Sequence, residues 1–207
     1  MSFEISFDIC ALIFNLMIII GVVGQIASGK GVLVKYLVKK FNFTSFSLSS
    51  IVHDELEKRN TTKFTRETMQ EVGNKLRCEY GGDILARRAI DRLKKQKNER
   101  IIIEGIRNPS EIEFLKKNSK IILIGIKTKK ELRFKRLLLR AKPWDPKNWE
   151  DFVKVDKNDF GIGQNNSGQQ VGKCLKYCDY ILTNNRDKQD FERKTEELMK
   201  VIFKAST

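Results

Sequence analysis

Histidine and cysteine are scarce in this sequence of 207 residues. It contains one histidine, His53, and four cysteines, of which only Cys174 and Cys178 lie close together. Zinc sites draw most of their ligands from these residue types, so the composition argues against a zinc protein. The cysteine spacing suggests no disulfide framework either, which fits a protein of the reducing cytoplasm.

The sequence also lacks an apolar run that fits a membrane span. Residues 9–23 are almost entirely apolar, but this stretch is shorter than the ~20 residues that cross a bilayer. Glu4 and Asp8 precede it, where a signal peptide carries positive charge. We therefore predict no membrane partner and interpret residues 1–16 as an extension ahead of a single domain, residues 17–207. A targeting role for the extension is the alternative.

Acidic residues are outnumbered: 26 Asp and Glu stand against 40 Lys and Arg, so the formal net charge is +14 at pH 7. Such an excess favours an anionic partner, such as a nucleotide, a nucleic acid or an acidic lipid. Because the basic residues are spread along the chain without a basic tail, the alternative is a lysine-rich solvated surface. No strand alternates aromatic and basic residues as an RNA-binding strand does, so we predict no nucleic-acid partner.

Short β-rich runs alternate with longer helical patterns along the chain. Five runs predict strands: residues 17–23, 43–48, 100–104, 120–127 and 179–183. This alternation predicts an α/β fold whose sheet is mostly parallel and covered by helices on both faces. Since no internal repeat or low-complexity linker interrupts the pattern, we predict one domain with two insertions, at about residues 50–97 and 129–172.

A glycine-rich stretch, GVVGQIASGKG at residues 21–31, joins the first predicted strand to an amphipathic helix. Its second part matches the first seven positions of the P-loop pattern. Glycines let a loop wrap a phosphate with its N–H groups, the following helix adds its dipole, and the lysine reaches the outer phosphates. We therefore predict that ATP binds here, on Gly24, Gln25, Ile26, Ala27, Ser28, Gly29, Lys30, Gly31 and Val32. The alternative is a glycine-rich turn that carries a surface lysine.

The loop lacks the serine or threonine that normally follows the lysine, because Gly31 and Val32 stand there. The missing hydroxyl usually helps to hold Mg²⁺, so the metal would be bound through water by a carboxylate elsewhere. Our candidate is Glu104, since ligands of open α/β sheets bind at the carboxyl ends of the strands. The alternative for Glu104 is a charged strand end that begins a solvent loop.

Three segments together resemble the nucleoside monophosphate kinases and dephospho-CoA kinases. Residues 24–31 contain Gly-Lys-Gly, which is common in the former, and Glu104-Gly-Ile-Arg107 is similar to their Asp-Gly-x-x-Arg element. Residues 178–185, CDYILTNN, are similar to their Ala-Asp-Tyr-x-Ile-x-Asn-Asp strand, and also to the kinase-like domain on some deoxycytidylate deaminases. The resemblance covers roughly residues 17–203. It implies a three-layer P-loop NTPase fold, dependence on ATP and Mg²⁺, an acceptor-binding insertion and a lid.

The first insertion contributes the candidate acceptor ligands. The resemblance implies that Ser49, Arg66 and Arg77 lie near the acceptor. Arg107 can bind a phosphate through two N–H groups, and either Arg66 or Arg77 can hold the acceptor beside it. Taken as single residues, Arg66 and Arg77 are each better explained as surface arginines, which is the alternative.

The second insertion supplies the candidate lid. Arg133, Arg136 and Arg140 are spaced by three and four residues, so they share one helical face. Arginines of a closing lid stabilise the charge that spreads over a transferring phosphoryl group. We predict this role for Arg136 and Arg140, which join Lys30 and Glu104 as catalytic residues. The alternative is that this arginine face pairs with Asp or Glu.

The sequence thus predicts a kinase that transfers the γ-phosphoryl group of ATP to a small nucleotide-like acceptor. A (deoxy)nucleoside monophosphate is the first choice and dephospho-CoA the alternative. A second hypothesis is a catalytically silent nucleotide-binding module, which the missing hydroxyl at Gly31 and Val32 favours. A third is a nucleic-acid-binding protein, which only the net charge supports.

Replacement of Lys30 by alanine tests the P-loop interpretation. We expect Lys30→Ala to abolish phosphoryl transfer and to leave the fold intact, because the ammonium stabilises phosphate charge and is not part of the core. Turnover with the cognate acceptor and circular dichroism of both proteins measure the two effects. Wild-type turnover in the variant would contradict the assignment.

Overall fold

A five-stranded sheet forms the centre of the computed structural model, which describes residues 18–60, 65–94 and 99–205. Its strands are β1 (Ile18–Gly24), β2 (Thr44–Ser47), β3 (Arg100–Glu104), β4 (Ile121–Lys127) and β5 (Tyr180–Thr183). They lie in the order β2-β3-β1-β4-β5, and all four pairings are parallel. The predicted α/β class is confirmed. The proposed extension, residues 1–16, lies outside the described residues.

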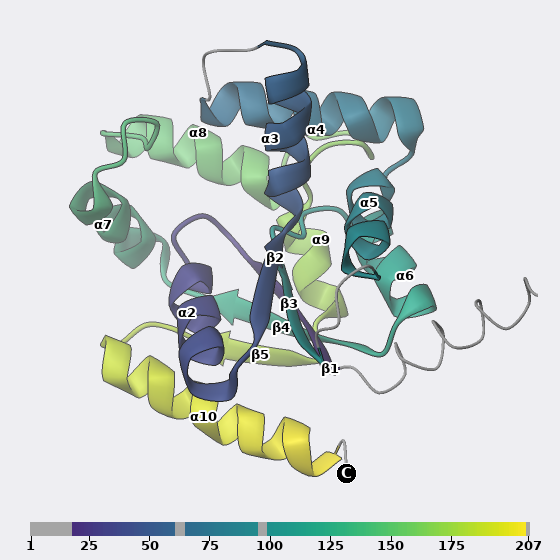
Figure 1. Ribbon diagram of the computed structural model, residues 1–207. Helices are drawn as coiled ribbons and strands as arrows, with labels where there is room; N and C mark the ends of the chain where they lie inside the picture. Colours follow the sequence, from purple (N-terminus) through teal and green to yellow (C-terminus); the bar gives the residue numbers. More distant parts are fainter. Residues whose placement is uncertain (1–17, 61–64, 95–98, 206–207) are drawn as a thin grey trace, which may run out of the picture.

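Helices cover both faces of this sheet. They are α2 (Lys30–Phe41), α3 (Leu48–Lys58), α4 (Arg66–Tyr80), α5 (Ile84–Leu93), α6 (Pro109–Asn118), α7 (Lys130–Arg140), α8 (Trp149–Phe160), α9 (Val171–Cys174), which the 3₁₀ turn η1 (Leu175–Tyr177) continues, and α10 (Lys188–Ala205). Figure 1 shows α2 and α10 together on one face, and α5, α6 and α9 on the other. Within the described ranges, no helix has the length and apolar character needed to cross a membrane.

The middle strand β1 is buried on both faces. Ile19 and Val23 pack in the cluster beneath α3, α5 and α6, whereas Ile20 and Val22 pack beneath α2 and α10. This alternation follows from the two-residue period of a strand between two helical layers. Each of these buried side chains contributes roughly 1.5–3 kcal/mol. The glycine loop therefore begins from the most firmly held strand of the sheet.

Because all strands are parallel, their carboxyl ends meet at one edge. The β1–β3 register pairs Val22 with Glu104, and the β2–β3 register pairs Ser47 with Glu104. Figure 1 shows α3, α4 and α8 gathered at this end, beside the loop between β1 and α2. Helix α3 begins at Leu48, directly after β2, with Ser47 as its N-cap residue.

A buried ion pair joins α4 to α6 behind this edge. Nη2 of Arg77 lies 2.8 Å from Oε1 of Glu111, and their side chains are 3% and 0% exposed. The other oxygen of Glu111 accepts hydrogen bonds from the backbone N–H groups of Arg107 and Asn108. Glu111 thereby caps α6 and fixes the turn that carries Arg107.

Replacement of Glu111 tests this arrangement. We expect Glu111→Ala to lower the free energy of unfolding by about 3–5 kcal/mol, because it leaves a buried guanidinium without its carboxylate. Urea denaturation measures the loss. Glu113→Ala is the matched control on the same helix, since Glu113 is exposed and loses only an exposed hydrogen bond from Tyr177. This variant should cost no more than about 1 kcal/mol. Equal losses in the two variants would show that the pair does not hold the turn.

Candidate active site

The loop of residues 24–31 turns sharply between β1 and α2. Ala27 and Gly29 have positive φ angles of 56° and 108°. A Cβ on Gly29 would lie 2.1 Å from Nδ2 of Asn184, so only glycine fits at this position. That same Nδ2 donates to the carbonyl of Ser28 at 3.0 Å. The segment after β5 therefore supports the loop from outside.

Lys30 stands at the start of α2 and reaches back over the loop. Its Nζ donates to the carbonyl oxygens of Gly24 at 2.6 Å and Gln25 at 2.9 Å. Glu104, at the end of the neighbouring strand, is partly buried, and burial raises the pKa of its carboxyl while the charge of Lys30 lowers it. The described residues offer Glu104 no hydrogen bond or ion pair. A cation beside the loop would compensate this carboxylate.

The carboxylate of Glu104 is the group on which the fit of a magnesium ion depends. The described part of the chain contains no group of three or more His, Cys, Asp or Glu that could hold a metal. Mg²⁺ often takes one or two protein carboxylates and completes its shell with water and phosphate oxygens. Glu104 therefore fits a magnesium ion that arrives with a nucleotide, in the water-mediated manner that the sequence predicts.

Helix α8 places two carboxylates against the glycine loop, and no motif in the sequence pointed to them. Asp156 accepts a hydrogen bond from Nε2 of Gln25 at 3.0 Å and forms a buried ion pair with Arg133 of α7. Asp159 accepts a hydrogen bond from the backbone N–H of Ile26 at 2.9 Å. Their spacing of three residues puts both on the face of α8 that turns toward the loop. Two acidic residues at this spacing are equally typical of a solvated helix face, so the sequence held no signal that singles them out.

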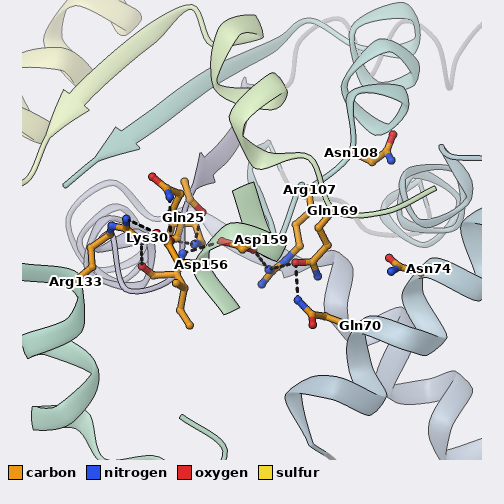
Figure 2. Close-up of polar contacts among 12 residues, drawn as sticks. Gln25, Lys30, Gln70, Asn74, Arg107, Asn108, Arg133, Asp156, Asp159 and Gln169 are labelled. Atoms are coloured by element: carbon orange, nitrogen blue, oxygen red, sulfur yellow. Dashed lines mark hydrogen bonds and ion pairs between the residues drawn. The ribbon is translucent and has the colours of Figure 1, made fainter. Parts of the chain in front are cut away.

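A row of polar side chains continues from the glycine loop to α4, as Figure 2 shows. Asp159 forms an ion pair with Arg107, whose Nη1 also donates to Oε1 of Gln169 at 3.1 Å. The same oxygen accepts a hydrogen bond from Nε2 of Gln70 at 3.0 Å. The row therefore connects α8, the turn after β3, the segment before α9, and α4. Gln169 belongs to a run for which the sequence indicated no chemistry.

A pocket of about 230 Å³ lies at the α4 end of this row. It combines an apolar lining with amide and guanidinium groups, which is the usual composition of a small-molecule site. The apolar part includes Val52, Met69, Leu85 and Trp144, and the polar part includes Ser49, Gln70, Arg77, Arg107 and Gln169. The pocket thus lies at the carboxyl edge of the sheet, and Arg107 and Asp159 connect it with the glycine loop.

Three of the four predicted acceptor ligands line this pocket: Ser49, Arg77 and Arg107. Arg66 is the first residue of α4, and its side chain lies outside the described part of the structure. The charge of Arg77 is compensated by Glu111, and that of Arg107 by Asp159. The structure therefore places these residues together, while their role as ligands stays a prediction.

The arginine face of α7 has three separate partners. Arg133 forms an ion pair with Asp156 of α8. Arg140 pairs with Asp145, and its Nη2 lies 2.7 Å from Oδ1 of that residue. The alternative of pairing with acidic residues therefore describes these two. Nη2 of Arg136 donates to the carbonyl and side-chain oxygens of Asn184, at 3.0 and 3.1 Å. Its Nη1 is buried and has no hydrogen-bond partner among the described residues, and burial lowers the pKa of Arg136. Catalytic roles for Arg136 and Arg140 stay predictions.

Comparison with solved structures identifies the fold. The crystal structure of TT1252 from Thermus thermophilus is 15% identical, with a TM-score of 0.60, and the match covers 89% of this chain and 97% of that one. Shikimate kinase from Acinetobacter baumannii in complex with shikimate is 14% identical, with a TM-score of 0.56, covering 94% and 98%. At such identities the likeness concerns the fold, which is that of the P-loop kinases in three layers.

Comparison of sequences identifies the family. The model of the AAA domain matches residues 23–152. The UPF0200 protein of Thermococcus onnurineus is 31% identical over 192 residues, which are 90% of this chain and 98% of that protein. The UPF0200 protein of Thermococcus sibiricus is 32% identical over 185 residues, covering 87% and 93%. The chain therefore belongs to the UPF0200 proteins, and the part that carries its glycine loop is an AAA domain.

Proposed function

We propose that this protein transfers the γ-phosphoryl group of ATP to a small nucleotide-like acceptor, most simply a (deoxy)nucleoside monophosphate, in the cytoplasm. The observation that carries the proposal is the position of Arg107. Its guanidinium contacts Asp159, which is bonded to the glycine loop, and also Gln169, which lines the pocket. A donor on the loop and an acceptor in the pocket would therefore meet on either side of Arg107.

The donor half of the reaction rests on the glycine loop. Its backbone N–H groups, the amino end of α2 and the ammonium of Lys30 would hold the phosphates of ATP. Lys30 now donates to two loop carbonyls, and we propose that it exchanges these for phosphate oxygens. Magnesium, when bound, supplies further neutralisation of phosphate charge, and Glu104 is the residue that would hold it through water.

The acceptor half rests on the chemistry of the pocket. In the described structure, neither Nε2 of Gln169 nor Oε1 of Gln70 has a hydrogen-bond partner. A donor and an acceptor on neighbouring amides match the edge of a nucleobase. Trp144, which is 47% exposed and lines the pocket, offers an aromatic face for the ring. These groups support an acceptor that contains a nucleoside. Dephospho-CoA, which also contains one, is the alternative.

A catalytically silent nucleotide-binding module is the second candidate, and one observation favours it. Gly31 carries no hydroxyl, although a Cβ at this position would meet no atom within 4 Å. Packing therefore does not require glycine here, and the loop has room for the serine or threonine of an active P-loop kinase.

A panel of acceptors tests the proposed function. We expect one nucleoside monophosphate, or dephospho-CoA, to raise ADP release from Mg-ATP far above background in the wild type and not in Lys30→Ala. Shikimate belongs in the panel because a structural neighbour is a shikimate kinase bound to it. ATP binding without turnover across the whole panel would contradict the kinase and favour the silent module.

Replacement of Glu104 separates its proposed catalytic role from its cost to the fold. Burial raises the pKa of Glu104 above the ordinary 4.5, so the ionised carboxylate destabilises the folded state. We expect Glu104→Gln to raise the melting temperature at neutral pH. The gain should disappear as the pH falls and Glu104 takes up a proton. Turnover should fall by about 10²-fold or more, as expected for loss of one charge-stabilising group.

Thermal unfolding at neutral and acidic pH, together with the turnover assay, measures both effects of Glu104→Gln. Glu131→Gln is the matched control, because Glu131 is an exposed glutamate on α7. A melting temperature that does not rise at neutral pH, or full turnover in the Glu104 variant, would contradict this account.

A further inference from the structure

Two groups that bind phosphate elsewhere in kinases converge here on a carboxylate of the chain itself. Asp159 is 2% exposed, pairs with Arg107, and accepts the backbone N–H of Ile26 at 2.9 Å. Backbone N–H groups of a P-loop and arginine guanidinium groups are both typical partners of phosphate oxygens. Figure 2 shows Asp159 between Gln25 of the loop and Arg107, which lines the pocket. The transferring phosphoryl group would pass through this region.

We propose that Asp159 occupies an anion-binding site of the phosphotransferase, formed by the Ile26 N–H and Arg107, and that a phosphate oxygen of the bound substrates replaces it. The inference rests on the proposed function, because it identifies where the outer phosphate of that reaction lies. In this proposal the present structure is a closed state, in which the carboxylate of Asp159 occupies the phosphate site of the glycine loop. Binding of ATP is then an exchange of one anion for another.

The attachment of α8 supports this exchange. Its second carboxylate, Asp156, holds Gln25 of the loop and Arg133 of α7. In the described structure the loop contributes only Ile26 and Ala27 to the apolar cluster around Phe152, whereas Phe134 and Leu137 in the same cluster pack α8 against α7. This cluster is separate from the two that pack on the sheet. Polar contacts therefore contribute much of what holds α8 to the loop, and such contacts can be exchanged for those of a ligand.

Electrostatics gives the direction of the exchange. The phosphates of ATP on the loop would bring several negative charges next to the carboxylate of Asp159, and like charges at short range repel. Movement of Asp159 away from the loop removes this repulsion and frees Arg107 for phosphate oxygens. Asp159 holds the Ile26 N–H and pairs with Arg107, which lines the pocket, and the phosphoryl group that is transferred has to face the acceptor in that pocket. The outermost phosphate of ATP therefore competes with Asp159 more directly than the phosphates of ADP do.

Calorimetric titration of Asp159→Asn with Mg-ATP and Mg-ADP tests the proposal. The amide keeps the shape of the side chain and removes its charge, so the closed state no longer competes with phosphate. We expect the Kd for Mg-ATP to fall about tenfold, as when a competing closed state loses its population, and the Kd for Mg-ADP to fall less. Glu150→Gln is the matched control: it removes one charge from an exposed position of the same helix and should change neither Kd.

The outcome that overturns the proposal is a Kd for Mg-ATP that is unchanged or raised in Asp159→Asn, or equal gains for ATP and ADP. A second measurement on the wild type does not depend on the variant folding. Mg-ATP should increase hydrogen exchange of the α8 amides at residues 156–160, and unchanged protection of saturated protein would also refute the proposal. Neither measurement needs turnover, so an inactive acceptor panel would overturn the proposed function and leave this inference standing.

Discussion

The burial of β1 on both faces is the constraint on which the site depends. Apolar residues on each side of the strand pack into separate helical layers, so the strand has no freedom to shift in register or to tilt. The glycine loop begins at the carboxyl end of β1, and the β1–β3 register places Glu104 beside that end. Because the pairings are parallel, Ser47 at the end of β2 and the turn after β3 that carries Arg107 also lie at this edge. The position of the lysine, the acid and the arginine therefore follows from the packing of one strand.

Charge in this protein is organised on two scales. The net charge of +14 belongs to the chain as a whole, whereas four arginines near the site are compensated individually by acidic partners. Arg77 has Glu111, Arg107 has Asp159, Arg133 has Asp156 and Arg140 has Asp145. These four arginines therefore add little net positive charge to the site. The pairs differ in burial: that of Arg77 is enclosed and suits a structural role, whereas Arg107 stays partly open to the pocket and can change its partner.

Two glycines of the loop differ in whether the surrounding structure requires them. Gly29 is required because the side chain of Asn184 fills the space in which a Cβ would lie. Gly31 has no such neighbour, so its lack of a side chain is not imposed by the fold. Gly29 is therefore required by the backbone conformation and packing of the loop. Gly31 removes the hydroxyl that a P-loop usually offers to a metal ion, so metal binding would depend more on Glu104.

The sequence by itself determined the elements and the glycine loop, because both depend on neighbours along the chain. Residues 100–104 read as a buried strand from their own composition, and the spacing from Gly24 to Lys30 carries the chemistry of the loop. Only the tertiary structure decided the partners. Asp159 meets the N–H of Ile26 across a separation of 133 residues, and Gln169 meets Gln70 across 99. No local pattern encodes such contacts, because they arise when α8 and the segment before α9 fold over the same edge of the sheet. For this reason the phosphate loop could be predicted from the sequence, and the residues that close it could not.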